Sequence, residues 1–272
     1  MIQYPHCKIN LGLSIVAKRA DGFHELETVF YPVALKDILE ITPAKTNDAT
    51  SFSNSGLAIP GDSINNLCLK AYHLLKADFP SLPEIQMHLH KIIPMGAGLG
   101  GGSSDGTFAL KILNALFQIG LSLEQLMLYA EKLGSDCPYF LYDTPCHATG
   151  KGELLSPIEC NLSNYSIVLL HPGIHIATPW AFQQIMPCKK DKLIAAIIQQ
   201  PISTWKQELM NDFEAPVIQA HPIIGALKND LYQQGAVYAS MSGSGSSLYG
   251  IFEKNKKYQK SDLSKNVRID TV

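Results

Sequence analysis

The sequence predicts a globular chain that mixes strands and helices and is long enough to form two domains. Apolar residues make up 46% of the 272 residues and charged residues 17%, a balance typical of folded proteins. Some stretches alternate apolar and polar residues, which indicates strands, and others space apolar residues by three and four, which indicates helices. A chain of this length usually divides. We expect the boundary near Cys160, which gives domains over residues 1–159 and 160–272.

Charge, hydropathy and cysteine spacing exclude several classes of protein. The formal net charge of −2 argues against a nucleic-acid-binding surface, which would usually be basic. Apolar runs stay below the ~18 residues that cross a bilayer, and the N-terminus lacks the pattern of a signal peptide. The six cysteines form no C-x-x-C pair and are expected to be reduced. We therefore expect a cytoplasmic protein with no nucleic-acid or membrane partner.

The N-terminal region is predicted to contain three strands. They cover residues 7–16, 25–33 and 37–42, and Asp21-Gly22 supplies the turn chemistry of a hairpin between the first two. Side chains two apart on a strand point the same way, so Lys8 and Asn10 should share a face. From the residues alone, Lys8 could equally be a solvated lysine on an open sheet face.

The middle of the chain is predicted to be mostly helical. The expected elements are a helix over residues 65–77, a strand over 84–93, a helix over 108–117, a second helix over 121–133, and short strands over 146–151 and 153–157. Ser122 and Gln125 form a capping-box pair at the start of the second helix.

A glycine-rich loop joins the strand over 84–93 to the helix that follows. Five glycines lie between Gly96 and Gly102, and two serines come directly after them. Glycines allow backbone amides to approach a ligand closely, and a helix start adds unpaired N–H groups with a partial positive charge. The pattern predicts an anion site, most often one for phosphate. Pro94 stiffens the entry, which argues against a flexible linker.

Three common phosphate-loop templates fit this segment poorly. Gly96, Gly98 and Gly101 match the dinucleotide fingerprint, but the region about twenty residues further on has the pattern of a helix instead of a strand with a terminal acidic residue. Gly102 stands where a P-loop needs lysine. The H-R-D and D-F-G motifs of protein kinases are missing from the sequence.

The C-terminal part is predicted to restart with a strand over residues 166–170. Pro179 suits the first turn of a helix that begins at Thr178, and Asn211 is expected to cap another helix. Strands over 236–240 and 248–252 flank a glycine-serine loop, Met241–Ser247, which alone would be a hairpin turn. The polar stretch 254–262 is expected to be a surface helix.

The glycine loop closely resembles the phosphate-binding motif of the GHMP small-molecule kinases, P-x-x-x-G-L-x-[SG]-S-S. Lys8–Leu13 looks like the first motif of this family and Met241–Ser247 like the third, so the motifs occur in family order over nearly the whole chain. The resemblance implies an α+β fold with a ribosomal-protein-S5-like N-terminal domain and a ferredoxin-like C-terminal domain. It also implies ATP and Mg²⁺. The residues implied to bind ATP are Pro94, Met95, Gly96, Ala97, Gly98, Leu99, Gly100, Gly101, Gly102, Ser103 and Ser104.

One branch of the family is matched more closely than the others. Arg19-Ala-Asp-Gly-Phe-His24 resembles its D-G-Y-H motif, and its members phosphorylate a small alcohol that carries a cytidine diphosphate, in non-mevalonate isoprenoid biosynthesis. Phe23 replaces the usual tyrosine and keeps a ring that can stack on a base. The residues that the resemblance places on this substrate are Asn10, Phe23, His24, Phe30, Phe182, Gly243 and Ser244.

The resemblance also suggests how the reaction would run. Asp136, in Gly134-Ser-Asp-Cys-Pro138, matches the catalytic base, although a Gly-x-Asp before proline is more often a turn. Lys8 would lie beside Asp136 and keep the carboxylate ionised, and Asn10 would orient the acceptor. The alternatives are another GHMP kinase of the homoserine or mevalonate type, a non-catalytic nucleotide sensor on the same scaffold, or a dinucleotide oxidoreductase.

Four histidines and Lys91 are the other titratable residues that the sequence singles out. The pairs His88/His90 and His171/His175 are expected to be structural, since a metal site normally needs three or four ligands, and we expect no metal site in the protein itself. Lys91 is either a charge at a strand end or, as a hypothesis, a long-range phosphate contact. The sequence allows a monomer or a homodimer.

Overall fold

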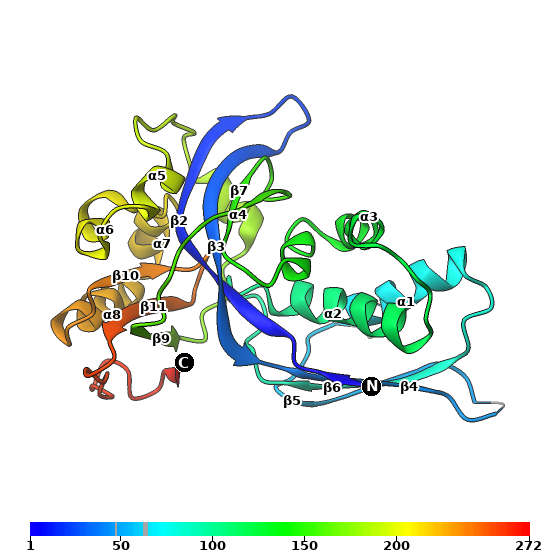
Figure 1. The fold of residues 1–272 in the computed structure, drawn as a ribbon. Helices are drawn as coiled ribbons and strands as arrows, with labels where there is room; N and C mark the ends of the chain where they lie inside the picture. The colour runs from blue at the N-terminus through cyan, green and yellow to red at the C-terminus, as the bar shows by residue number, and fades with distance from the viewer. Residues whose placement is uncertain (47, 62–64) are drawn as a thin grey trace. The chain divides into compact units, whose positions relative to one another are not determined.

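The computed structural model describes residues 1–46, 48–61 and 65–272. The strands are Ile2–Gln3 (β1), His6–Lys18 (β2), His24–Lys36 (β3), Ile38–Pro43 (β4), Ser51–Gly56 (β5), Ile85–Lys91 (β6), Cys146–Thr149 (β7), Leu154–Pro157 (β8), Tyr165–His171 (β9), Tyr238–Met241 (β10), Leu248–Glu253 (β11) and Arg268–Thr271 (β12). The helices are Leu67–Asp78 (α1), Gly101–Leu116 (α2), Leu123–Leu133 (α3), the 3₁₀ helix Pro138–Leu141 (η2), Thr178–Gln183 (α4), Ile194–Ile198 (α5), Ile202–Glu208 (α6), Glu214–Ala220 (α7) and Pro222–Gln233 (α8). Figure 1 shows these elements along the chain.

The chain forms two compact units whose segments alternate along the sequence. The first unit contains residues 1–7, 34–95 and 100–143, and the second contains residues 8–33, 96–99 and 144–272. The glycine loop is therefore shared, because Gly96–Leu99 belong to the second unit and the residues on either side belong to the first. These interleaved units do not follow a single cut, and the boundary near Cys160 stays a prediction.

The first unit is a four-stranded sheet covered by helices. The strand order is β1-β4-β6-β5, with β4 and β6 antiparallel and β5 and β6 parallel. Figure 1 shows α1, α2 and α3 on one side of this sheet. Along β6, Ile85, Met87 and Leu89 are buried, whereas the intervening polar side chains are partly or fully exposed. This alternation is the pattern expected of a strand with one face against helices and one face in water.

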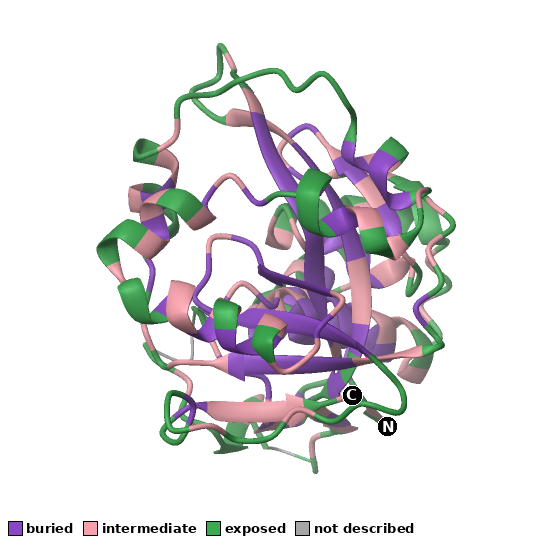
Figure 2. Ribbon diagram, turned by 90° about the vertical axis from the view of Figure 1, so that its left-hand side faces the viewer, coloured by how far each residue is buried: buried purple, intermediate pink, exposed green. Residues whose placement is uncertain are grey.

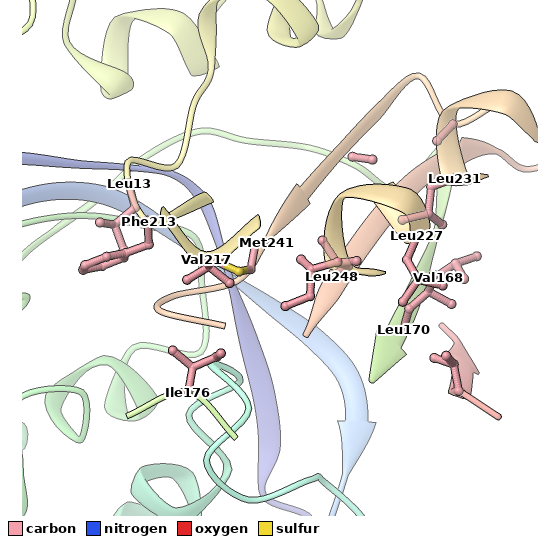
Figure 3. Packing of buried hydrophobic residues seen from close by; sticks show 14 of the residues in the cluster. Leu13, Val168, Leu170, Ile176, Phe213, Val217, Leu227, Leu231, Met241 and Leu248 are labelled. Carbon is pink, nitrogen blue, oxygen red and sulfur yellow. The ribbon is translucent and has the colours of Figure 1, made fainter. Parts of the chain in front are cut away.

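The second unit contains two further four-stranded sheets. Their orders are β2-β3-β7-β8 and β10-β11-β9-β12. Apolar side chains from β2, β9, β11, α7 and α8 meet in one cluster, of which Figure 3 shows fourteen residues. Leu13, Val217, Leu227, Leu248 and Val168 are among the labelled members, and each is almost fully buried. This cluster places β10 and β11, and the loop between them, on a rigid base.

The long strand β2 is buried on both faces from Cys7 to Ile15. Figure 2 shows buried residues concentrated in the long strands, with exposed residues along the loops and the outer sides of the helices. A strand of this kind carries its polar side chains into the interior, where each needs a partner. The polar residues of β2 are therefore well placed for a site.

The C-terminal part of the fold corrects two predictions. Residues 254–262 form turns and irregular chain instead of a helix. Tyr258 and Ser261 direct their hydroxyl groups to Asp230 Oδ2, at 2.6 and 3.0 Å, so side-chain contacts fix this stretch where a helix was expected. The helix expected to start at Asn211 begins at Glu214, and its N-cap is Phe213.

Several elements were not predicted at all. They are the short edge strands β1, β5 and β12 and the helices α5, α6 and α8.

Within the described ranges, none of the helices is long and apolar enough to cross a membrane.

Candidate active site

Two polar residues of β2 begin a buried hydrogen-bond chain in the second unit. Lys8 Nζ donates to Asn10 Oδ1 over 2.7 Å, and Asn10 Nδ2 donates to Thr28 Oγ1 of β3 over 3.0 Å. The prediction that Lys8 and Asn10 share a face is confirmed. Lys8 is 4% exposed and Asn10 2%, so the alternative of a solvated lysine is wrong. A buried cation on this face is suited to offset negative charge, because charges interact more strongly away from water.

The aromatic residues predicted to line a cytidine pocket fall into separate contacts. The Lys8 ammonium lies 4.7 Å from the centre of the Phe30 ring, a cation–π distance. His24 stacks on Phe182 of α4, with ring centres 4.9 Å apart and an angle of 19° between the planes. Phe182 in turn meets Phe213 edge to face. The structure thus brings His24 and Phe182 together and sets Phe30 beside Lys8.

Phe23 lies at the tip of the β2–β3 hairpin with 57% of its surface exposed. Its N–H donates to Asp21 Oδ1 over 3.1 Å, which fixes the turn. Lys151 Nζ lies 4.8 Å from the centre of the Phe23 ring. An exposed ring held by its own turn is a surface on which a base can stack.

The first half of the glycine loop is tied to the second unit through its carbonyl groups. Leu99 O accepts from Lys8 N over 3.0 Å, and Ala97 O accepts from Ser247 N over 3.2 Å. Gly98 O accepts from Ser242 Oγ over 2.8 Å. The C=O of one residue and the N–H of the next point in opposite directions across a trans peptide. The N–H groups of Gly98 and Leu99 therefore point away from these partners.

The second half of the loop runs directly into helix α2 of the first unit. Gly100, at φ +68°, is the N-cap and provides no side-chain cap. Ser104 N donates to Gly100 O over 2.9 Å, so the N–H groups of Gly101, Gly102 and Ser103 precede the first helical bond. An uncapped helix start of this kind is a binding site for anions. A helix follows the loop as predicted, but it begins at Gly101 instead of residue 108.

The hydroxyl group of Ser104 makes no hydrogen bond with the described part of the protein. Its Oγ is fully buried. A buried hydroxyl without a partner costs free energy. A bound oxyanion or cation at the helix start would satisfy it.

The segment that holds Asp136 packs against the first turn of α2. Thr107 Oγ1 lies 2.9 Å from both Ser103 O and Cys137 O, so it joins the two segments. Burial raises the pKa of the Cys137 thiol to about 12, while hydrogen bonds with Ser103 and Thr107 oppose the shift. Asp136 is half-buried at the turn before η2. Asp136 belongs to the first unit and Lys8 to the second, and their proximity stays a prediction.

A buried ion network anchors α2 to the sheet of the first unit. Lys91 Nζ donates to Asp105 Oδ2 over 2.7 Å and also to Asp37 Oδ2. Asp37 Oδ1 accepts the N–H of Ile93 over 2.9 Å, just before the glycine loop. The three charged side chains are at most 4% exposed. Lys91 is the last residue of β6, so its predicted place at a strand end is confirmed, and its charge is paired inside the first unit. Its contact with phosphate stays a prediction.

Within this network, burial and ion pairing shift the pKa of each group in opposite directions. Burial alone would lower the pKa of Lys91, but the carboxylates of Asp105 and Asp37 outweigh it and raise that pKa. Burial raises the pKa of Asp105 well above its ordinary value, and Asp37 adds to the shift while Lys91 opposes it. One cation shared between two carboxylates fixes three elements at a single point.

A cavity of about 180 Å³ lies beside the start of α2 in the first unit. Its walls combine apolar side chains with asparagine amides. The lining residues are Phe52, Asn54, Ile59, Pro60, Gly61, Asn65, Asn66, Leu67, Met95, Gly102 and Asp105. Apolar walls with a few placed polar groups are typical of small-molecule sites.

The loop Met241–Ser247 joins β10 to β11 and reaches the other two motifs. A Cβ added at Gly243 would lie 3.3 Å from Gly98 Cα and 3.5 Å from Asn10 Oδ1. Ser244 Oγ lies 3.1 Å from Thr178 Oγ1 at the start of α4. Gly243 is therefore placed beside Asn10 and the first half of the glycine loop.

Sequence reasoning missed several residues of this region. Thr28 and Asn211 are buried and hydrogen-bonded to the motifs, and Asp37 and Asp105 hold Lys91. Thr28 could have been found from the sequence, because it is a polar residue inside a predicted apolar strand. The asparagines of the cavity could not, because no local sequence pattern distinguishes them from ordinary loop residues.

Three of the four histidines predicted to be structural, His88, His90 and His171, have hydrogen-bond partners in the protein. His88 lies within hydrogen-bond distance of Ser53 and Ser55, and His171 Nδ1 lies 3.2 Å from Ser247 Oγ. Over residues 1–46, 48–61 and 65–272, no group of three or more His, Cys, Asp or Glu side chains is arranged to hold a metal ion.

Comparisons with known proteins agree with this geometry. The family model for the GHMP kinases N terminal domain matches residues 66–144, and the model for the GHMP kinases C terminal domain matches residues 193–265. A protein of Bacteroides thetaiotaomicron named 4-diphosphocytidyl-2-C-methyl-D-erythritol kinase is 50% identical over 98% of this chain and 97% of its own length. A protein of Cytophaga hutchinsonii with the same name is 51% identical over 93% of this chain and 92% of its own.

Solved structures show the same relationship. A crystal structure of 4-(cytidine 5'-diphospho)-2C-methyl-D-erythritol kinase superposes with a TM-score of 0.79 at 31% identity, covering 92% of this chain and 90% of that chain. A homoserine kinase from Cytophaga hutchinsonii superposes with a TM-score of 0.69 at 15% identity, which shows a shared fold alone. The predicted fold class is confirmed. This chain belongs to the GHMP kinases, among the relatives named 4-diphosphocytidyl-2-C-methyl-D-erythritol kinase.

Proposed function

We propose that this kinase transfers the terminal phosphoryl group of ATP to a hydroxyl of 4-diphosphocytidyl-2-C-methyl-D-erythritol and forms the 2-phosphate, a step in making isoprenoid precursors without mevalonate. The names of the full-length relatives support this substrate. The observation that carries the proposal is the convergence of Lys8, Asn10, Gly98 and Gly243 in one buried region. Such a region can hold an alcohol beside a phosphate loop.

The phosphate groups of ATP would bind along the glycine loop and the start of α2. The uncapped N–H groups of Gly101, Gly102 and Ser103 are suited to phosphate oxygens. The orphan hydroxyl of Ser104 fits a phosphate oxygen or a Mg²⁺ ion held with it. Mg²⁺ commonly binds through substrate phosphates and few protein ligands, which fits a site where Ser103 and Ser104 supply the oxygens.

The base of ATP would enter the cavity beside α2. Phe52, Ile59, Leu67 and Met95 can cover the faces of a flat ring, and the asparagine amides can donate to and accept from its edge. The cavity also includes Gly102, so a base bound there leads directly to the phosphate site.

The acceptor side would use Asp136, Lys8 and Asn10. Asp136 would accept the proton of the hydroxyl as it attacks, and Lys8 would offset the charge on the phosphoryl group in transfer. Asn10, which already accepts a hydrogen bond from Lys8, would orient the alcohol. Phosphoryl transfer depends mainly on such positioning and electrostatic stabilisation.

The cytidine group would be held by the aromatic residues of the second unit. His24 and Phe182 already form a stacked pair, and Phe23 offers an exposed ring face, whereas Phe30 is buried beside Lys8. Gly243 and Ser244 would lie against the acceptor end of the substrate. A cytoplasmic location and a monomeric or homodimeric state stay predictions.

A coupled assay of ADP release tests the substrate. We expect turnover with the cytidine-diphosphate alcohol and little with homoserine or mevalonate. Turnover of homoserine or mevalonate in its place would reassign the protein within the family. ATP binding without any ADP release would favour a sensor, and nicotinamide binding without ATP binding would favour an oxidoreductase.

Two variants test the roles on the acceptor side. Asp136→Asn should fold normally and lose turnover by about 10²–10⁴, and Lys8→Ala should lose turnover while nucleotide binding survives. Calorimetric titration with a non-hydrolysable ATP analogue and circular dichroism serve as controls. Near-normal turnover of Asp136→Asn would refute the base assignment, and an unfolded Lys8→Ala protein would make Lys8 structural.

A further inference from the structure

The hydroxyl of Ser242 joins all three sequence motifs. Ser242 follows β10 directly and is completely buried. Its Oγ donates to Gly98 O over 2.8 Å and accepts the N–H of Asn10 over 3.3 Å. One side chain of the third motif therefore holds the first half of the glycine loop against the strand that carries Lys8 and Asn10.

The backbone of Ser242 is fixed on both sides by its own loop and by Asn211. Ser242 N donates to Ser247 O over 2.9 Å, and Ser242 O accepts from Gly245 N over 3.0 Å. Asn211 Nδ2 donates to Met241 O over 2.8 Å and to Gly243 O over 2.9 Å, so it brackets Ser242. Asn211 is itself 3% exposed. A residue held in this way can set the position of its neighbours.

The contact between Ser242 and the glycine loop leaves no free space. A Cβ at Gly98 would lie 1.9 Å from Ser242 O, far inside the van der Waals limit. The two backbones touch, and the hydroxyl spans from one to the other. A shift of the loop relative to β2 would therefore have to break the hydrogen bond of Ser242.

We infer that Ser242 is a positioning residue for phosphoryl transfer, because its hydroxyl sets the spacing between the glycine loop and the Lys8–Asn10 strand, with Asn211 holding Ser242 in place. The inference rests on the proposed kinase reaction. Lys8 reaches Asn10 Oδ1 through its own side chain, so a displacement of β2 from the loop would also carry the Lys8 ammonium away from the transferring group.

The test is steady-state kinetics on Ser242→Ala. A displacement of about 1 Å at a reacting centre can lower a rate 10²-fold, and we expect kcat to fall by about 10- to 100-fold. The KM for ATP should stay close to that of the native enzyme, because the N–H groups of α2 and the residues of the cavity are held by contacts of the first unit. A purely structural role would not split kcat from KM in this way.

Three variants separate hydrogen bonding from volume. Ser242→Cys keeps the size of the side chain and weakens the hydrogen bond, so it should lose kcat as Ser242→Ala does. Ser242→Thr retains the hydroxyl and should recover most of the turnover. Asn211→Asp keeps the acceptor for Phe213 N–H but loses both donors, and its kcat should also fall.

Ser240→Ala is the matched control. Ser240 is 1% exposed, lies two residues earlier on β10 and donates to Glu214 Oε1 over 2.9 Å. The same truncation there should lower the melting temperature about as much as Ser242→Ala and leave kcat unchanged.

The outcomes separate this inference from the proposed function. Failure of the native enzyme on the cytidine-diphosphate alcohol overturns the proposed function. Equal kcat values for Ser242→Ala and Ser240→Ala, measured with whichever acceptor the native enzyme turns over, overturn the inference. If Ser242→Ala does not fold, Ser242→Cys decides, and native kcat in that variant also overturns the inference.

Discussion

At the residue scale, the site depends on backbone groups whose directions a few side chains control. Three consecutive carbonyl groups of the glycine loop accept hydrogen bonds from Lys8, Ser242 and Ser247. The opposite edges of those peptides carry N–H groups. The sequence predicted the glycines and the phosphate site, because a glycine cluster before a helix has few other uses. It could not predict Ser242 as the contact, because a contact 144 positions away in the chain leaves no local pattern.

Gly98→Ala should abolish activity and destabilise the fold. The residue has φ +77°, and an added Cβ would lie 1.9 Å from Ser242 O, where only backbone movement could make room. We expect a loss of more than about 3 kcal/mol, the scale of a severe core defect. Urea denaturation followed by circular dichroism measures it.

Gly120→Ala is the control for the conformational part of that effect. Gly120 has φ +81° but no atom within 4 Å of an added Cβ. Its cost should stay near the ~1 kcal/mol of a left-handed non-glycine residue. A Gly98→Ala protein as stable as Gly120→Ala would show that the loop can move away from Ser242.

At the element scale, the start of α2 is held in place by the ion network of Lys91. Asp37 precedes β4, Lys91 ends β6 and Asp105 lies in the second turn of α2, so three elements share one cation. The sequence predicted β2, β6, α2 and α3 well, and the capping box of α3 is present. Helices α5 and α6 have five and seven residues, too few for periodicity to be recognised. Ile224, Leu227 and Leu231 do give the spacing of α8, and that signal was overlooked.

Lys91→Met should be strongly destabilising. Removal of one partner of a buried ion pair typically costs about 3–5 kcal/mol, because the remaining charges stay buried. Here two carboxylates would face each other without their cation. Urea denaturation of Lys91→Met, with Lys76→Met at a partly exposed surface pair as the control, measures the difference.

The defect of Lys91→Met should shrink as the pH falls. Burial raises the folded-state pKa of Asp105 above its unfolded value, so the contribution of this group to stability is present at low pH and lost as the pH rises through the folded pKa. In Lys91→Met the lysine no longer opposes this shift, so the folded-state pKa of Asp105 rises further. We expect the unfolding free energy of Lys91→Met to approach that of the native protein as the pH falls from neutrality toward the unfolded pKa of about 3.9. A constant difference over that range would contradict the network.

At the scale of the whole molecule, the chain passes between its two units five times, and an ion pair lies at two of those passages. His6 Nε2 lies 2.8 Å from Asp143 Oδ1, and Lys111 Nζ lies 2.8 Å from Asp143 Oδ2. These contacts join the first segment of the first unit to its last residue. No sequence pattern could predict them, because His6 lies 137 positions from Asp143 and Lys111 lies 32 positions from it.

Asp143→Asn should lower stability at neutral pH and have no effect in strong acid. Burial alone would raise the pKa of Asp143, but His6 and Lys111 outweigh it and lower that pKa to about 2. The contribution is therefore present above the unfolded value of about 3.9 and lost as the pH falls through about 2. The side chain is 47% exposed, so screening limits the effect to below about 1 kcal/mol.

Urea midpoints of the native protein and Asp143→Asn, measured at several pH values, check this prediction. Asparagine tolerates the φ of +54° at this position, so the variant isolates the charge. A difference that grows toward acid would show that another group is responsible.

The shared glycine loop has a consequence for how this protein is made. Gly96–Leu99 leave the ribosome long before Ser242 and Ser247, whose groups donate to Gly98 and Ala97. A nascent polypeptide that stops before β10 has the whole phosphate-binding motif in its sequence and lacks the groups that shape half of it. The first half of the loop therefore acquires its final shape only after the hairpin of β10 and β11 has been made.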